Sequence, residues 1–385
     1  MEVIHKLLNI VAPPFTFFSL CLFLPPFWFY KFFLSILSSI FSENVAGKVV
    51  IITGASSGIG EHLAYEYAKR GALLALAARR EKSLEEVADR AREYGSPDVL
   101  VIPADVSKVE DCKRIVGETM DHFGRCKCKW LIQILFYALS LFHLKWGFSF
   151  IYCGNNNMMV AVDHLVSNAG INSVCMFEDT TDITLFRTIM DINFWGSVYT
   201  TRFAVPHLRN SRGKIVALAS SASWLPAPRT SFYNASKAAM VTFFETLRIE
   251  VGPEIKITIV TPGFIESEIT QGKFLVQDGK MVVDQDLRDV QVSTIPVGTA
   301  QGCAAAIVNG ACRGERYLTQ PAWFKATYFW KVFCPEMIEW CYRLMYMNRP
   351  GTSDRETLSK KILDLTGAKN ILYPSTIHTP DIKTD

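Results

Sequence analysis

A tyrosine and a lysine four residues apart, Tyr233 and Lys237, form the clearest pattern for acid–base chemistry in the chain. They lie in Tyr-Asn-Ala-Ser-Lys within a helical pattern, and this spacing places both side chains on one helix face. A free tyrosine has a pKa near ~10 and is a poor acid or base at neutral pH. A neighbouring ammonium lowers that pKa and would let the tyrosine exchange a proton with a hydroxyl or carbonyl oxygen. Such pairs are common by chance, so the spacing needs support from other residues.

Two polar residues upstream give that support. Ser220 follows the apolar run 214–219 and would hold the oxygen of a substrate. Asn193, in Met-Asp-Ile-Asn, would anchor a water molecule in a proton relay. We therefore predict Asn193, Ser220, Tyr233 and Lys237 as one catalytic group.

A glycine-rich loop follows the apolar run 49–53 and precedes a helical pattern. Glycines allow a tight turn and a close approach of the backbone to a pyrophosphate, and the N-terminus of the helix adds partial positive charge. This context predicts a dinucleotide site, in which an oxidised nicotinamide would further favour the phenolate of the tyrosine. The predicted contacts are Gly54, Ser56, Ser57, Gly58, Ile59 and Gly60.

The end of the next apolar run predicts which dinucleotide binds. An NAD site usually places a carboxylate here for the ribose 2′-hydroxyl, but this chain has Arg79 and Arg80. Guanidinium groups pair well with the 2′-phosphate of NADP, so we predict NADP(H). Both arginines are also compatible with ordinary solvated surface charge. Asp105 ends a third apolar run and would accept a hydrogen bond from the adenine amino group.

The elements that must position these residues alternate between short apolar strands and helical patterns. The expected strands are 49–53, 73–78, 100–103, 164–168, 214–219 and 256–260. Apolar strands separated by helices predict an α/β fold with a doubly wound parallel sheet, the Rossmann type. Such folds bind ligands at the carboxyl ends of strands, which adds Asn168, Pro262 and Gly263 to the predicted cofactor contacts.

An apolar segment over residues 1–42 precedes this domain. No residue from Leu7 to Tyr30 carries a full charge, and ~20 apolar residues are enough to cross a bilayer as a helix. The pairs Pro13-Pro14 and Pro25-Pro26 predict a broken helix or hairpin on a membrane or lipid droplet. A simple spanning anchor and a cleaved signal peptide are the alternatives.

An insert over 126–161 interrupts the domain, which we place at 43–314. Connections at such positions usually take only a few residues. The insert is mostly apolar and aromatic, and is either a second membrane-dipping element or translated non-coding sequence. Its Cys126, Cys128 and Cys153 lack zinc spacing, so we predict no metal site.

The segment over 315–385 begins with many aromatic residues, interleaved with Lys325, Lys331 and Arg343. This pattern fits an interfacial stretch, a lid over an apolar substrate or ordinary packing. The tail beyond Gly351 is polar and is expected to be loose.

Composition narrows the possible partners and substrates. The chain has 385 residues and a net charge of +3, which gives no indication of nucleic acid as a partner. The expected substrate loop covers 264–298. Its apolar side chains predict an apolar ligand and are Phe264, Ile265, Phe274, Leu275, Met281 and Val282.

Taken together, these motifs resemble the short-chain dehydrogenase/reductase family over roughly 44–314, excluding the insert. The matching segments are TGASSGIG, ADVS, SNAG, MDIN, the serine opening SSAS, YNASK and TPG. The resemblance implies a catalytic tetrad of Asn193, Ser220, Tyr233 and Lys237, with Lys237 also binding the nicotinamide ribose. It further implies that Ser267 contacts the carboxamide, where a threonine often stands.

The apolar, proline-containing N-terminus is similar to one group of that family, the plant 11β-hydroxysteroid dehydrogenase-like proteins or steroleosins. That resemblance implies NADP(H), a sterol or steroid alcohol/ketone substrate, and attachment to lipid droplets or endoplasmic reticulum with the catalytic domain facing the cytosol. A homodimer is common in the family. Ser167 and Ser223 depart from the usual motif without removing a catalytic group. The alternative is a lipid-droplet coat or sterol-binding protein with little catalysis.

Overall fold

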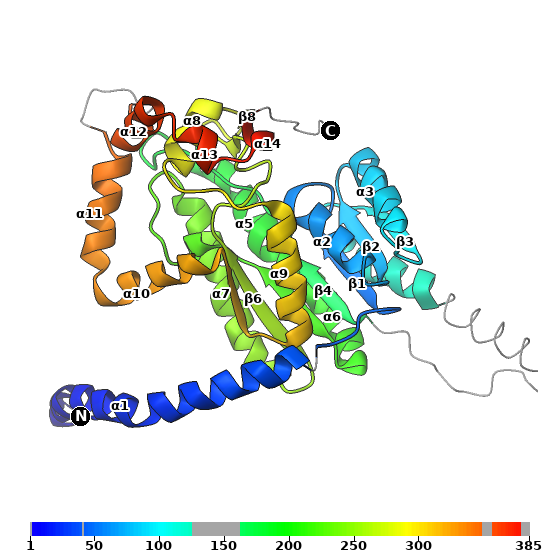
Figure 1. The fold of residues 1–385 in the computed structure, drawn as a ribbon, viewed down its shortest axis with the longest axis horizontal. Coiled ribbons are helices and arrows are strands. Elements are labelled where there is room, and N and C mark those ends of the chain that lie inside the picture. Colours follow the sequence, from blue (N-terminus) through cyan, green and yellow to red (C-terminus); the bar gives the residue numbers. More distant parts are fainter. Residues whose placement is uncertain (1, 41, 125–161, 349–355, 379–385) are drawn as a thin grey trace, which may run out of the picture.

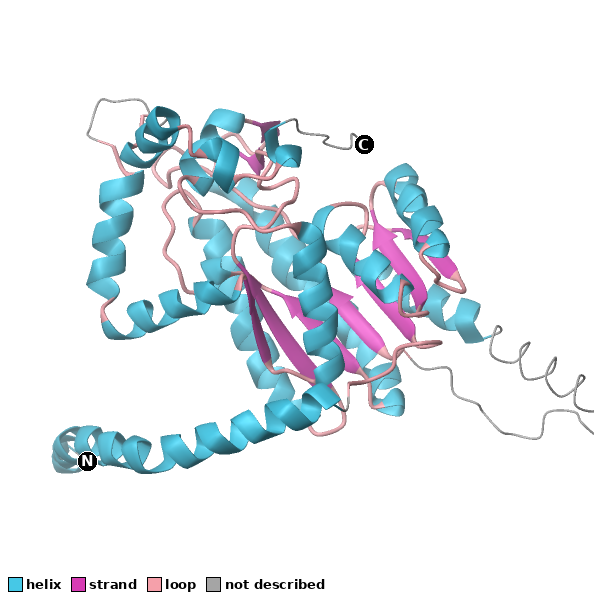
Figure 2. Ribbon diagram, in the orientation of Figure 1, coloured by secondary structure: helices cyan, strands magenta, loops and turns pink. Residues whose placement is uncertain are grey.

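The computed structural model describes residues 2–40, 42–124, 162–348 and 356–378. Its centre is a parallel sheet of seven strands in the order β3-β2-β1-β4-β5-β6-β9 (Figures 1 and 2). The strands are β1 (Val49–Thr53), β2 (Leu73–Ala78), β3 (Val99–Pro103), β4 (His164–Ser167), β5 (Lys214–Leu218), β6 (Lys256–Pro262) and β9 (Tyr317–Gln320). The predicted doubly wound α/β fold is confirmed. Because β9 lies beyond residue 314, the sheet domain extends further than the sequence indicated.

Helices cover both faces of the sheet. The described helices of the domain are α2 (Gly58–Ala68), α3 (Glu81–Glu93), a helix over 109–124, α6 (Gly196–Ser211), α7 (Ser231–Val251) and α9 (Ala300–Arg313). Within β1, Val50 and Ile52 pack into the core shared with α2, α3 and α9, whereas Val49 and Ile51 pack into the core shared with α6 and α7. Alternate side chains thus enter opposite cores, which is why the strands are apolar without a polar face.

The order of the strands changes direction between β1 and β4. The chain runs outward from β1 to β3 and then returns to β4 on the other side of β1. In open parallel sheets a ligand crevice forms outside the carboxyl ends of the strands at this point. Gly54, Asn168 and Ser220 directly follow or lie just beyond the ends of β1, β4 and β5.

Shorter elements cover the crevice. They are η1 (Ile183–Phe186), α5 (Arg187–Met190), the π-helical turn η2 (Asp191–Trp195), η3 (Ser221–Ser223), the hairpin β7 (Lys273–Leu275) with β8 (Met281–Val283), and α8 (Gln285–Val292). The hairpin and α8 belong to the predicted substrate loop.

The N-terminal segment forms one helix, α1 (Glu2–Ile40), with both proline pairs inside it. The predicted break is therefore wrong for this structure. A proline removes one backbone donor and crowds the preceding turn, and here the helix curves instead of ending (Figure 1). The stretch Ile4–Leu34 is long and apolar enough to cross a membrane, and none of its residues is buried.

The connection from α1 to the sheet is fixed by Glu43. Its carboxylate pairs with Lys214 and Lys48 and lies 3.4 Å from the imidazole of His164. Hydrogen bonds from these three groups outweigh burial and hold the pKa of Glu43 well below its usual range. The position where α1 joins the domain is thus held by charged contacts.

The C-terminal segment is ordered over 356–378, so the prediction of a loose tail is wrong there. Its helices are α12 (Leu358–Thr366), α13 (Lys369–Leu372) and α14 (Ser375–His378). Leu363, Tyr373 and Ile377 pack with Val292 and Val297 of the substrate loop. The buried guanidinium of Arg288 also donates to the carbonyl of Ile377 at 2.8 Å. A few apolar residues within a mostly polar stretch therefore pack these helices against the substrate loop.

Before them, η4 (Ala322–Phe324), α10 (Lys325–Phe333) and α11 (Pro335–Tyr346) form an arm beside the domain (Figure 1). Much of its apolar surface faces outward: Trp330 is 56%, Phe333 76% and Trp340 58% exposed. The predicted insert at 126–161, with its three cysteines, lies outside the described residues. In the part of the chain that is described, no cluster of three His, Cys, Asp or Glu side chains is placed to hold a metal.

Candidate active site

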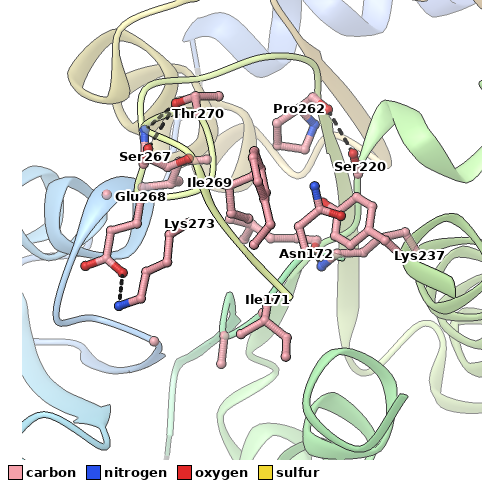
Figure 3. A pocket seen from close by; sticks show the side chains of 18 of the residues that line it. Ile171, Asn172, Ser220, Lys237, Pro262, Ser267, Glu268, Ile269, Thr270 and Lys273 are labelled. Atoms are coloured by element: carbon pink, nitrogen blue, oxygen red, sulfur yellow. Dashed lines mark hydrogen bonds and ion pairs between the residues drawn. The ribbon is translucent and has the colours of Figure 1, made fainter. Parts of the chain in front are cut away.

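A cavity of about 690 Å³ lies at the carboxyl ends of the strands (Figure 3). One part of its wall comes from the glycine-rich loop and the segment after β2, and another from the substrate loop and the C-terminal arm. Ser220, Tyr233 and Lys237 lie in the wall between these parts. The site thus combines a dinucleotide-type cleft with a second chamber.

Tyr233 and Lys237 lie one turn apart at the start of α7, as their spacing predicted. The ammonium of Lys237 is 5.8 Å from the centre of the Tyr233 ring and donates to the carbonyl oxygen of Leu218 at 2.9 Å. That backbone contact ties the lysine to the end of β5. Burial lowers the pKa of Lys237 to about 8.

Burial raises the pKa of Tyr233, while a hydrogen bond with Ser220 lowers it. Desolvation of the phenolate is thus the largest effect on this pKa, and its lowering by an ammonium together with an oxidised nicotinamide stays a prediction. Ser220 is fixed where β5 turns into η3. Its hydroxyl accepts a hydrogen bond from the amide of Ala222 at 3.2 Å and lies 3.5 Å from the carbonyl oxygen of Pro262.

Asn193 lies behind the cavity wall, in the π-helical turn η2. Its Oδ1 accepts from the amide of Ile171 at 2.8 Å, and its Nδ2 donates to the carbonyl of Ile171 and the hydroxyl of Ser236, both at 2.9 Å. A Cβ on Gly170 would lie 3.2 Å from Oδ1 of Asn193 and 3.4 Å from Nζ of Lys237. Gly170 therefore lies between Asn193 and Lys237, and the three hydrogen bonds of the Asn193 side chain position the backbone next to it.

The glycine-rich loop requires its glycines for steric reasons. A Cβ on Gly54 (φ +67°) would meet Cα of Ala169 at 2.7 Å, and one on Gly60 would meet the carbonyl oxygen of Gly54 at 2.2 Å. Asn168 donates its side-chain amide to the carbonyls of Thr53 and Gly54, each at 3.0 Å. These two hydrogen bonds from Asn168 thus stabilise the conformation of the loop. All six predicted loop contacts line the cavity: Gly54, Ser56, Ser57, Gly58, Ile59 and Gly60.

The predicted cofactor residues after β2 and β3 also line the cavity. Arg79 is exposed, and within the described part of the chain it has no hydrogen-bond or ion-pair partner. Arg80 donates to the hydroxyl of Ser57 at 2.8 Å and pairs with Glu268 at 2.5 Å. Asp105 accepts from the amide of Ser107 at 3.0 Å and from its hydroxyl at 2.8 Å, so one oxygen already holds a turn.

The segment after β6 completes the cofactor side. Pro262, Gly263 and Ser267, for which contact with a cofactor is predicted, line the cavity, and a Cβ on Gly58 would lie 3.2 Å from Cβ of Ser267. Of the predicted apolar substrate residues, five line the cavity and Val282 does not. Those five are Phe264, Ile265, Phe274, Leu275 and Met281.

Sequence reasoning missed several residues of the wall. Asn172, Glu268, Lys273, Phe324 and Tyr342 all line the cavity. None lies in one of the recognised motifs. Only the aromatic composition of the C-terminal arm indicated that residues such as Tyr342 could contribute to the cavity wall.

Comparison with known proteins agrees with this geometry. The family profile described as short chain dehydrogenase matches residues 48–128 and 154–277. The chain belongs to the short-chain dehydrogenase/reductase family. The matched segments carry the glycine-rich loop, Ser220, Tyr233 and Lys237. They leave out 129–153, most of the predicted insert.

The chain also has full-length relatives. It is 60% identical to 11-beta-hydroxysteroid dehydrogenase A of Sesamum indicum, and 58% identical to the protein of that name from Arachis hypogaea. Each alignment covers 100% of both chains. The chain is thus a short-chain oxidoreductase related to plant hydroxysteroid dehydrogenases.

Solved structures show the same fold at low identity. A short-chain type dehydrogenase/reductase from Mycobacterium marinum matches with a TM-score of 0.56 and 24% identity, over 73% of this chain and 96% of that one. An alcohol dehydrogenase from Thermococcus sibiricus, complexed with 5-hydroxy-NADP, matches with a TM-score of 0.50 and 22% identity, over 71% and 94%.

Proposed function

We propose that this protein is an NADP(H)-dependent oxidoreductase that interconverts a hydroxyl and a ketone on a sterol- or steroid-like apolar substrate. One observation carries the proposal. A single cavity places Ser220, Tyr233 and Lys237 between a glycine-rich cleft with two arginines and a chamber with apolar walls. An acid–base group at that junction can act on a substrate oxygen that lies beside a bound dinucleotide.

The residues present fit a dinucleotide. Neither Gly54, in the loop before α2, nor Gly60, in the first turn of α2, has room for a side chain, and the N-terminus of α2 presents backbone N–H groups to an anion. Arg79 and Arg80 supply positive charge where the adenosine ribose would lie, and no carboxylate follows β2 directly. These features support NADP(H) over NAD(H). When bound, the nicotinamide would supply or accept the hydride.

The residues of the chain handle the proton. In ketone reduction, the Tyr233 hydroxyl donates its proton to the carbonyl oxygen while Ser220 holds that oxygen in place. In alcohol oxidation, the tyrosine takes the proton back. Lys237, fixed by the carbonyl of Leu218, stabilises the phenolate that forms after donation. Asn193 keeps the backbone next to the lysine in position.

The substrate chamber supports an apolar ligand. Its walls include Leu185, Phe274, Leu275, Val292 and Tyr342. Burial of apolar surface would supply ~25 cal/mol per Å² of the affinity, and few charged groups reach this part of the cavity. A rigid, mostly apolar molecule with one reactive oxygen suits this chamber.

The helix α1 supports attachment to a lipid surface. It is long, apolar and exposed, and in Figure 1 it projects to the same side as α10 and α11. Exposed Trp330, Phe333 and Trp340, next to Lys331 and Arg343, resemble an amphipathic interface. We place the protein on the lipid droplet or endoplasmic reticulum, with the catalytic domain facing the cytosol and a homodimer as the expected assembly.

Substitution of Tyr233 by phenylalanine tests the proposal. The Tyr233→Phe variant should lose about 10²–10⁴-fold in turnover of a hydroxysteroid with NADP, because the proton donor is removed. NADPH binding, measured by fluorescence of the bound nucleotide, should stay unchanged. The exposed Tyr328 offers a matched control, and Tyr328→Phe should behave like the wild type. Retained turnover in Tyr233→Phe would overturn the assignment.

A sterol-binding or coat function is the second candidate, favoured by the large exposed apolar surface of α1 and the C-terminal arm. It predicts saturable sterol binding without any cofactor oxidation. Measurable NADPH consumption that depends on an apolar ketone would exclude it.

A further inference from the structure

The dinucleotide side of the cavity holds a charged cluster that the proton chemistry does not use. Oε1 of Glu268 accepts from Nη1 of Arg80 at 2.5 Å, and Oε2 accepts from Nζ of Lys273 at 3.1 Å. The three side chains line the cavity and are only 11–25% exposed. One carboxylate thus joins two cations, and Figure 3 shows Glu268 and Lys273 facing each other in the cavity wall.

Arg80 marks the adenosine end of the cleft. It follows β2, and its Nη2 donates to the hydroxyls of Ser57 at 2.8 Å and Ser56 at 3.2 Å. These bonds hold the guanidinium against the glycine-rich loop. A phosphate on the adenosine ribose of a bound dinucleotide would lie beside this segment.

The backbone of Lys273 is held independently of the Glu268 side chain. Its backbone amide donates to the carbonyl of Glu268 at 3.0 Å, and the turn before it is closed by Thr270, which accepts from the amide of Ser267 at 2.9 Å. Thr270 also donates to the carbonyl of Ile265 at 3.0 Å. A rotation of the Glu268 side chain would therefore leave the backbone of Lys273 and the serine-bound guanidinium of Arg80 in place.

We propose that Arg80 and Lys273 form a two-cation subsite for a phosphate on the adenosine ribose, and that Glu268 occupies this subsite as an internal competitor. A phosphate offers three strong acceptor oxygens and more negative charge than a carboxylate, so it can replace Glu268 on both cations. A ribose hydroxyl carries no charge and cannot. Glu268 and Lys273 are then specificity-determining residues, and this inference rests on the proposed preference for NADP(H).

The subsite also connects the two parts of the cavity. Lys273 opens β7, whose Phe274 and Leu275 line the substrate chamber. A phosphate held by Lys273 would therefore contact the same strand that shapes the apolar wall.

Binding of adenosine nucleotides to the full chain tests the subsite without catalysis. The probes are 2′,5′-ADP, which carries the ribose phosphate, and 5′-AMP, which lacks it, with affinities measured by calorimetry. Glu268→Gln should bind 2′,5′-ADP about tenfold more tightly because the competing charge is gone, and Lys273→Gln about tenfold more weakly. Affinity for 5′-AMP should change in neither variant, which also shows that the site is folded.

Two matched controls and a double variant sharpen the test. Lys280→Gln removes an exposed lysine paired with Asp278 on the same hairpin, and Glu254→Gln removes an exposed carboxylate paired with Arg209. Neither should alter the affinity for 2′,5′-ADP. In the Glu268→Gln background, Lys273→Gln should still weaken 2′,5′-ADP binding, because the lysine contacts the phosphate directly.

Four results would overturn the inference. If the Glu268→Gln variant changes the affinities for 2′,5′-ADP and 5′-AMP equally, Glu268 only closes a loop. If Lys273→Gln has no added effect on 2′,5′-ADP affinity in the double variant, the lysine only holds Glu268. A wild-type preference for 2′,5′-ADP that no variant shifts contradicts the subsite alone. Equal wild-type affinity for both nucleotides contradicts the proposed cofactor preference as well.

Discussion

The two ends of the cavity are built in different ways. The dinucleotide end consists of short contiguous motifs, in which Gly54 to Gly60 and the Arg79-Arg80 pair follow successive strands. The substrate end collects residues separated by more than 150 positions, from Leu185 to Tyr342. The dinucleotide end is polar and has no room for side chains at its glycines. The substrate end is apolar, and packing between separate elements forms it. Substitutions at the dinucleotide end should therefore cause large losses of cofactor affinity. Substitutions at the substrate end should cause smaller changes in KM for the substrate.

The largest effect on cofactor affinity should come from a methyl group in the glycine-rich loop. In Gly60→Ala the new Cβ would meet the carbonyl oxygen of Gly54 at 2.2 Å and Nδ2 of Asn168 at 2.5 Å, so the loop must shift. We expect NADPH affinity to fall by at least about 100-fold, measured by nucleotide fluorescence.

Gly117 provides the control for that substitution. It lies in the helix over 109–124, and a Cβ there would meet no atom within 4 Å. Gly117→Ala should leave NADPH affinity unchanged and stabilise the fold by about 0.5–1 kcal/mol. Tight NADPH binding by Gly60→Ala would show that the dinucleotide end is less strict than the contacts indicate.

Lys237, at the junction between the two ends, should give ketone reduction a pH dependence of intermediate size. Because the pKa of Lys237 is lowered to about 8, its ammonium is present below that pH and is lost as the pH rises through it. Ketone reduction should therefore be fastest below about pH 8 and fall up to about tenfold per unit above it. A profile of kcat/KM between pH 6 and 10 measures this, and a flat profile up to pH 10 contradicts a role for the ammonium.

The smallest effect should appear at the substrate end. Tyr342 lines the cavity from α11, and Tyr342→Ala should raise KM for an apolar ketone about fivefold through lost apolar contact, with little change in kcat. NADPH affinity should be the same as in the wild type. A loss of NADPH affinity in this variant would mean that the two ends are not separable.

Much of the fold and of the candidate catalytic group could be predicted because the evidence is local. An apolar strand followed by glycines and a helix fixes the place of Gly54 at the end of β1, and the spacing of Tyr233 and Lys237 fixes their shared helix face. The continuity of α1 could not be predicted, since two proline pairs are tolerated in an exposed helix that curves. The ordered helices after Thr357 were also missed, because a few apolar residues in a polar stretch reveal nothing until their partners on the substrate loop are known.

The sequence by itself determined which candidate residues follow which strand. It therefore determined which groups meet at the carboxyl edge of the sheet. Only the tertiary structure decided that Glu268, in the segment after β6, pairs with Arg80 across 188 positions of sequence and with Lys273 at the start of β7, and that Tyr342 contributes to the apolar wall. The reason is physical. A motif encodes contacts over one or two turns of chain, whereas long-range charge pairs and apolar walls depend on how separate elements pack.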